Sequence, residues 1–169
     1  MVEPWLRGTL TEVDAVRRQV LHALELAGED VERWCASLSD AEMGMRPFGV
    51  ASVGFHLRHV VRSLDRLLTY AEGRQLSAGQ LEMLGGELEG GSTVAGVMEE
   101  FRLGIAIADA RVRAVDSGTY EEARGVGRQR LPTTVGGLLV HCAEHTQRHI
   151  GQAVTTAQVV RGGRKRIER

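Results

Sequence analysis

The chain has 169 residues, and its 21 basic and 22 acidic side chains leave a net charge near zero. That balance gives no electrostatic reason to expect nucleic acid or an anionic membrane as a partner. The length is that of one domain, which can bury a core without disulfide cross-links. No apolar segment approaches the roughly 18 residues of a membrane span, and the N-terminus lacks signal-peptide features, so no membrane partner is expected. The two cysteines are isolated and indicate free thiols in a reducing, cytoplasmic compartment.

The first predicted helix spans residues 11–38, where apolar residues recur every three or four positions. Thr11 and Asp14 are candidates for its first residues, and Gly28 permits a bend without requiring a break. A proline and a glycine place a loop over residues 45–52.

The second predicted helix spans residues 52–72, with Ser52 as its N-cap. Two glycine pairs within residues 85–91 then interrupt the chain, and this connection has room for a short extra helix. Ser92 is the predicted N-cap of the third long helix, whose periodic apolar residues continue to Val112.

Residues 116–130 have no sustained period and contain three glycines, which predicts a loop with at most a short extended piece. The last helix is expected to start within residues 131–134 and to run to about Val160. Four long periodic segments with almost no β-type alternation predict an all-α protein folded as a four-helix bundle. We expect one domain over residues 1–160 and a basic, flexible tail over residues 161–169.

Three histidines of the last helix, His141, His145 and His149, are four residues apart and therefore share one stripe. His145 and His149 fall on the apolar side, where a neutral imidazole needs a hydrogen-bond partner or a metal. A ligand from a second helix would complete such a site. The second helix offers His56 and His59, and the helical wheel slightly favours His56 because it lies nearer the apolar seam.

A serine seven residues before a histidine, followed far downstream by His-x-x-x-His-x-Gly-Gln, resembles the DinB-like (DinB/YfiT) superfamily of metal-binding bundles. In this chain the matching residues are Ser52, His59 and the segment His145–Gln152. The resemblance covers the chain from the first helix to about residue 160. Where the superfamily more often has arginine, just after the last histidine, this chain has Ile150.

The resemblance implies that the metal ligands are His59, His145 and His149, and on the second helix we follow it in preference to the wheel. His56 and His141 remain secondary candidates, either as ligands or as residues that orient a ligand or carry a proton.

Several other residues and patterns receive a structural interpretation. Cys142 is expected to fill the core, and Glu144 and Arg148 to lie on the solvated face. A His-Glu-x-x-His peptidase motif is absent because Cys142 stands where its glutamate would be. The glycine pairs lack the Lys and Ser or Thr of a phosphate-binding loop.

Three imidazoles leave open positions on a divalent ion, for which zinc and nickel are the favoured candidates. The resemblance implies that some members are thiol-dependent transferases or isomerases, and it also implies a homodimer. We therefore expect a metal-dependent enzyme that acts on a small-molecule substrate, with a low-molecular-weight thiol as co-substrate. The alternatives are a metal-dependent hydrolase and a non-enzymatic, stress-associated dimeric bundle.

Overall fold

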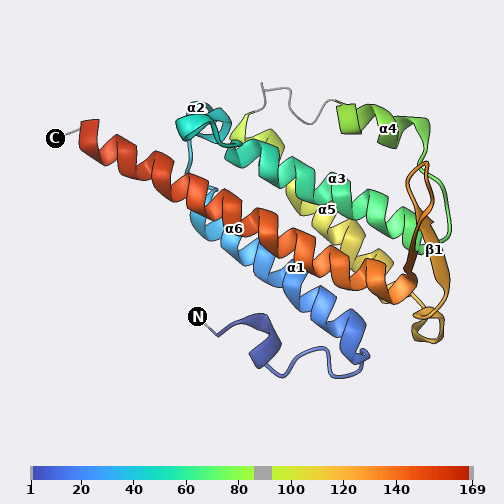
Figure 1. Ribbon diagram of the computed structural model, residues 1–169. Helices are drawn as coiled ribbons and strands as arrows, with labels where there is room; N and C mark the ends of the chain where they lie inside the picture. Colours follow the sequence, from blue (N-terminus) through green and yellow to red (C-terminus); the bar gives the residue numbers. More distant parts are fainter. Residues whose placement is uncertain (1, 86–92, 168–169) are drawn as a thin grey trace.

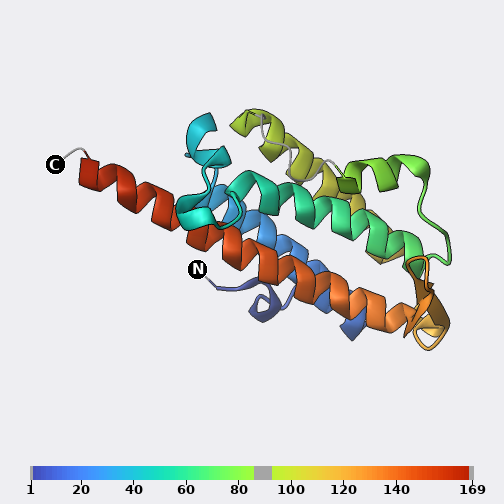
Figure 2. The same cartoon turned by 45° about the horizontal axis from the view of Figure 1, so that its top comes forward.

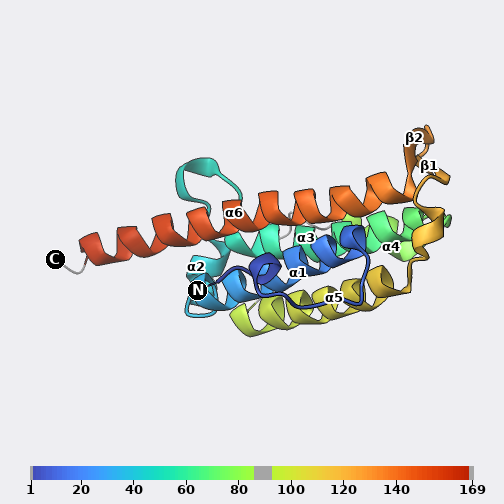
Figure 3. The ribbon, with the colours of Figure 1, turned by 90° about the horizontal axis from the view of Figure 1, so that it is seen from below.

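The fold is a four-helix bundle, as predicted. The computed structural model describes residues 2–85 and 93–167, with side chains as far as residue 163. Four long helices form the bundle (Figure 1): α1 (Ala15–Trp34), α3 (Val53–Ala71), α5 (Val94–Ala114) and α6 (Val135–Ile167). Helices α1 and α6 run in one direction, and α3 and α5 run in the opposite one (Figures 1 and 3). The helix α6 packs against both α1 and α3, so two of its faces lie within the bundle.

Helix α1 is shorter than the sequence predicts. It begins after Asp14, whose carboxylate accepts hydrogen bonds from the backbone N–H groups of Val16 and Arg17 at 3.1 and 3.3 Å. It ends at Trp34, whereas the predicted helix continued to Leu38. The apolar residues inside it are buried where the period expects them, at Val20, Leu24, Ala27 and Val31.

The predicted single helix over residues 11–38 is therefore corrected to α1 followed by a separate short helix, α2 (Asp40–Gly44). Ser39 starts α2 through a capping box, in which its hydroxyl accepts from the Glu42 backbone N–H and the Glu42 carboxylate accepts from the Ser39 N–H. The buried side chain of Leu38 continues the apolar period of α1 through the break, so the pattern alone could not reveal it.

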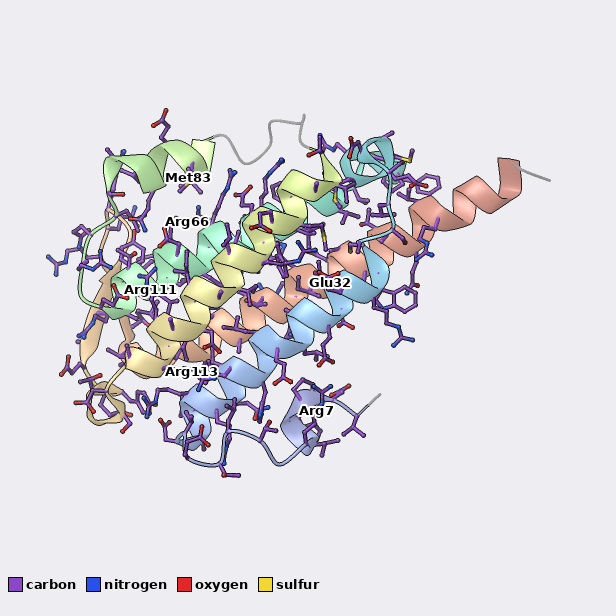
Figure 4. The ribbon with its side chains drawn as sticks, turned by 180° about the vertical axis from the view of Figure 1, so that it is seen from behind. Arg7, Glu32, Arg66, Met83, Arg111 and Arg113 are labelled. Atoms are coloured by element: carbon purple, nitrogen blue, oxygen red, sulfur yellow. The ribbon has the colours of Figure 1, made fainter. Side chains whose placement is uncertain are left out.

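Helix α3 begins where the sequence predicts. The Ser52 hydroxyl accepts a hydrogen bond of 3.2 Å from the Phe55 backbone N–H. On the other side of the bundle α3 approaches α5 closely, because a Cβ atom at Gly104 would lie only 2.4 Å from Cβ of Val61. Figure 4 shows α5 across the back of the bundle, where Nη1 of Arg111 donates to Oδ1 of Asp65 on α3 at 2.7 Å. These contacts fix the position of α3 on which the candidate site depends.

The connection between α3 and α5, for which the sequence predicts a short extra helix or a loop, contains a helix, α4 (Ala78–Gly85). The predicted cap Ser92 lies outside the described residues. Thr93 caps α5, because its hydroxyl accepts a hydrogen bond of 3.1 Å from the backbone N–H of Gly96.

A β-hairpin precedes α6, in a region where the sequence predicts a loop with at most a short extended piece, followed by the start of a helix. Strands β1 (Ala123–Val126) and β2 (Leu131–Thr134) pair antiparallel. Residues 131–134 are therefore extended, which corrects the predicted helix start. The Thr134 hydroxyl then accepts from the backbone N–H of Gly137 at 3.1 Å, at the beginning of α6.

Helix α6 also continues to Ile167, past the predicted end near Val160 and through a pair of glycines. In Figure 1 this last part of α6 extends beyond the ends of the other three bundle helices. None of the described helices combines the length and the apolar character needed to cross a bilayer.

Candidate metal centre

The candidate metal centre lies between α3 and α6, which run side by side in opposite directions (Figure 2). His59 comes from the second turn of α3, and His145 and His149 occupy successive turns of α6. Each histidine offers a ring nitrogen, and the three nitrogens lie within 4.8 Å of one another. All three side chains are half-buried. The structure thus brings together the three histidines that the resemblance implies, which we call the three-histidine group.

The geometry of the group fits one metal ion. The Nε2 atoms of His59 and His145 are 3.1 Å apart. Two nitrogens at this separation, each about 2.05 Å from an ion, subtend an angle of about 100° at it, between the octahedral and tetrahedral values. The ring centre of His149 lies 4.4 Å from that of His59 and 4.5 Å from that of His145. The same Nε2 separation also suits a hydrogen bond in which one ring carries the proton.

Burial keeps the rings in the form that binds metal. Desolvation, aided by the neighbouring His59, His141 and Arg148, lowers the pKa of His145 to about 4. Desolvation and the neighbouring imidazoles of His59 and His145 lower the pKa of His149 to about 4 as well. Both rings are therefore uncharged at neutral pH, and their lone pairs are available to a cation.

His56 contacts the three-histidine group from outside. Its Nδ1 atom lies 3.1 Å from the Nδ1 atom of His149, and its side chain is buried. Burial, and then the charge of His59, lowers the pKa of His56. This contact occupies one nitrogen of His149 and leaves the other, Nε2, for an ion. The wheel favours His56 as the ligand of α3, but the geometry places it in an orienting position.

Two residues that the sequence analysis did not select pack against His59. The ring of Phe55 stacks on it, with ring centres 5.3 Å apart and planes inclined by 14°. The Ser63 hydroxyl lies 3.4 Å from Nε2 of His59, and it accepts a hydrogen bond of 3.0 Å from Arg66. Phe55 and Ser63 are each four residues from His59, and this spacing was the signal that could have identified them.

His141, Cys142 and His22 lie outside the group. The side chain of His141 is 43% exposed; its Nδ1 atom is 3.4 Å from Oε2 of Glu144, and its ring centre is 5.4 Å from that of His145. Cys142 is fully buried, and burial raises the pKa of its thiol to about 12, so it fills the core as predicted. His22 is a buried residue of α1, with Nε2 3.2 Å from the Thr9 hydroxyl.

An open pocket of about 620 Å³ adjoins the centre. It lies between α6 and the segment that joins α2 to α3, which stands out over α6 in Figure 3. His56 therefore contacts both the pocket and the three-histidine group. The lining residues are Val50, Ala51, His56, Arg148, Gly151, Gln152, Thr155 and Thr156. Arg148 is exposed as predicted, but it forms part of the pocket wall.

The structure is a four-helix bundle in which three histidines from two of the helices converge. It therefore falls in the class of helical bundles that can hold a divalent ion. The chain belongs to the DinB superfamily, whose family model matches residues 10–153. The match includes the whole three-histidine group and confirms the resemblance found in the sequence. No curated protein and no solved structure matches the chain.

Proposed function

We propose that this protein is a divalent-metal-dependent enzyme that joins a low-molecular-weight thiol to an electrophilic small molecule. The observation that carries the proposal is the three-histidine group, in which each of the three described ligands offers one imidazole nitrogen and no carboxylate takes part. When bound, a zinc or nickel ion would supply an uncompensated double positive charge, which favours an anionic ligand and lowers the pKa of a thiol.

The reaction that we propose is a nucleophilic transfer. The thiol loses its proton to solvent, and the sulfur lone pair forms a bond to an electrophilic carbon. The leaving group departs from that carbon with its bonding electron pair, and a proton taken up from water balances the charge. A set of three imidazoles leaves ligand positions open, which is typical of catalytic rather than structural metal sites.

The residues around the group would keep it ready for this chemistry. Desolvation of His145 and His149 prevents protons from competing for their lone pairs. Of the two Nδ1 atoms that face each other in the His56–His149 pair, one must carry a proton, and this contact restricts rotation of the His149 ring. The stacked ring of Phe55 restricts His59 in the same way.

The cellular setting forms part of the proposal. Cys35 and Cys142 are both free and buried, which fits the reducing cytoplasm expected from the sequence. Membership of the DinB superfamily supports a homodimer. Leu103 and Ile107 are exposed apolar residues one turn apart on α5, and they offer a surface for contact between the two subunits.

The test combines metal analysis with turnover. Protein purified without an affinity tag is assayed for bound zinc and nickel, and then for consumption of cysteine, glutathione or 2-mercaptoethanol with 1-chloro-2,4-dinitrobenzene. We expect metal-dependent consumption of thiol, lost in His59→Ala and His145→Ala. Metal bound without turnover of any thiol would contradict the transferase.

One observation favours a second candidate, a metal-dependent hydrolase. The imidazole of His141 lies between the Glu144 carboxylate and the ring of His145, where it could take a proton from an attacking water molecule. In this reaction the water oxygen attacks a carbonyl carbon, and the leaving group departs with the proton that His141 returns. Loss of ester hydrolysis in His141→Ala with unchanged metal content would support the hydrolase.

The third alternative is a non-enzymatic bundle. It is favoured if neither reaction occurs and chelation of the metal strongly lowers the melting temperature.

A further inference from the structure

We infer that the pocket beside His56 and Arg148 binds the carboxylate of a small substrate that has an apolar body. This inference rests on the proposed function, because the pocket would place that substrate next to the three-histidine group. The connection is direct, since His56 lines the pocket and its Nδ1 atom is 3.1 Å from Nδ1 of His149.

The charge of the pocket wall favours an anion. Arg148 is the one residue of the wall with a permanent charge, and the wall contains no carboxylate. Arg148 forms an ion pair with Glu144 one turn earlier in α6, but both side chains are more than half exposed. An exposed pair of this kind is weak, so a ligand carboxylate can replace Glu144 at little cost. Arginine also matches a carboxylate with two parallel hydrogen bonds.

The rest of the wall has a polar side and an apolar side. Gln152 and Thr155 come from the same helix as Arg148. The Thr155 hydroxyl already donates to the Gly151 carbonyl at 2.8 Å, so the N–H donors that this side offers a carboxylate are those of Arg148 and the Gln152 amide. Val50 and Ala51 form the opposite, apolar side, and Val50 is 52% exposed.

The loop that carries this apolar side presents one more feature. Phe48, two residues before Val50, is 97% exposed, and its backbone has a φ of 54°, which is unusual for a bulky residue. Phe48 is close in sequence to the apolar side of the pocket but does not line the pocket itself.

A glycine opens the floor of the pocket. Gly151 lines the pocket, and a Cβ atom there would meet no other atom within 4 Å, so the backbone has room for a side chain at this position. Gly28, inside α1, has equally open surroundings and lines none of the described pockets. The two glycines therefore give a matched pair, in which only one substitution fills the pocket.

The test uses three probes of similar shape: benzoate, benzyl alcohol and benzylammonium. Backbone amide signals of the ¹⁵N-labelled protein are followed during titration, with bound metal measured in the same samples. We expect benzoate to shift the signals of Gly151, Gln152 and Thr155 and to bind about tenfold or more tightly than benzyl alcohol, with benzylammonium weakest. Equal binding of benzoate and benzyl alcohol, or shifts confined to other helices, would overturn the inference.

Four variants sharpen the result. Arg148→Gln should remove the preference for benzoate over benzyl alcohol, and Glu144→Gln should strengthen benzoate binding because it frees the guanidinium. Gly151→Phe should abolish binding of all three probes, whereas Gly28→Phe should leave it unchanged. A preference for benzoate that survives in Arg148→Gln, or binding that survives in Gly151→Phe, contradicts the assignment.

The carboxylate could belong to the electrophile or to the thiol, and a comparison of thiols distinguishes these sources. If 3-mercaptopropionate binds more tightly than 2-mercaptoethanol, and only while Arg148 is present, the carboxylate belongs to the thiol. If benzoate binds alongside saturating 3-mercaptopropionate, the carboxylate belongs to the electrophile. Failure of the proposed function would appear separately, as benzoate binding by a protein that holds no metal.

Discussion

His56 and His149 face each other across the interface of α3 and α6, with their Nδ1 atoms 3.1 Å apart. One of these nitrogens must carry the proton of the hydrogen bond. When His149 donates it, the lone pair of His149 Nε2 points away from His56 and is free to bind a cation. In that arrangement a buried residue outside the ligand set holds a ligand in the tautomer that binds metal.

Replacement of His56 should therefore weaken metal binding without removing the site. We expect His56→Ala to reduce zinc affinity about 10- to 100-fold, and His56→Asn, which keeps a hydrogen-bonding side chain, to restore part of it. Competition against a chromophoric chelator measures both. His141→Ala is the control, because His141 lies outside the three-histidine group. An affinity of His56→Ala equal to that of the control would show that the contact does not orient the ligand.

The lowered pKa values of His145 and His149 predict how the metal-free protein responds to acid. Their folded-state pKa of about 4 lies below the ordinary value of 6.5, so the unfolded chain binds more protons between these two values. Stability should be full above about pH 6.5 and should fall as the pH approaches 4. Chemical denaturation at a series of pH values, with nitrogen NMR of the imidazoles, measures this. Titration of both rings near 6.5 would contradict it.

Alanine substitution should have opposite effects on stability at two glycines, Gly104 at the close approach of α3 and α5 and Gly28 in the open surroundings of α1. Gly104→Ala places a Cβ atom 2.4 Å from Cβ of Val61, and we expect a loss of about 1 to 3 kcal/mol in the free energy of unfolding. At Gly28 a Cβ atom meets nothing within 4 Å. Gly28→Ala should therefore gain up to about 1 kcal/mol from helix propensity. Urea denaturation compares the two, and a stabilising Gly104→Ala would be inconsistent with this packing.

A hydrogen bond at the start of α1 predicts a further dependence on pH. The Tyr120 hydroxyl donates to Oδ1 of Asp14 at 2.6 Å. Burial raises the pKa of Asp14, but hydrogen bonds from Tyr120 and Arg17 outweigh it and lower the pKa to about 2. The folded value lies below the ordinary 3.8, so the stabilisation is present above that pH and is lost as the pH falls toward 2.

Tyr120→Phe should therefore cost about 1 to 2 kcal/mol at neutral pH, and the difference from the parent should shrink below pH 3.8. Thermal unfolding at pH 7 and pH 2.5 makes the comparison. A difference that does not change with pH would show that the Asp14 charge plays no part in it.

The fold was predictable where a local signal specifies it. The Ser52 cap and the apolar period place α3 correctly, and the spacing of His145 and His149 puts both on one face of α6. The break between α1 and α2 was missed because Leu38 continues the apolar period across it. The short extended piece allowed within residues 116–130 corresponds to β1, but β2 was predicted as the start of a helix. Its pairing with β1 was missed because these four-residue strands are stabilised by each other and not by their own pattern.

The candidate metal centre, like the fold, was predictable only where a local signal specifies it. His59 came from the resemblance, while the helical wheel favoured His56, because the wheel has no information on how α3 is rotated against α6. The contribution of Arg148 to the pocket depends on the loop around Val50 returning over α6, a contact between residues about a hundred positions apart. Such contacts have no signature in either segment alone.

The most direct test of the central claim is the metal stoichiometry of the untagged protein and its single variants. We predict one zinc or nickel ion per chain, retained in His141→Ala and lost in each of the alanine variants of His59, His145 and His149, with all variants still helical by circular dichroism. A parent protein that binds no divalent ion, or a His59→Ala variant that binds it as tightly as the parent, would contradict a metal centre shared by α3 and α6.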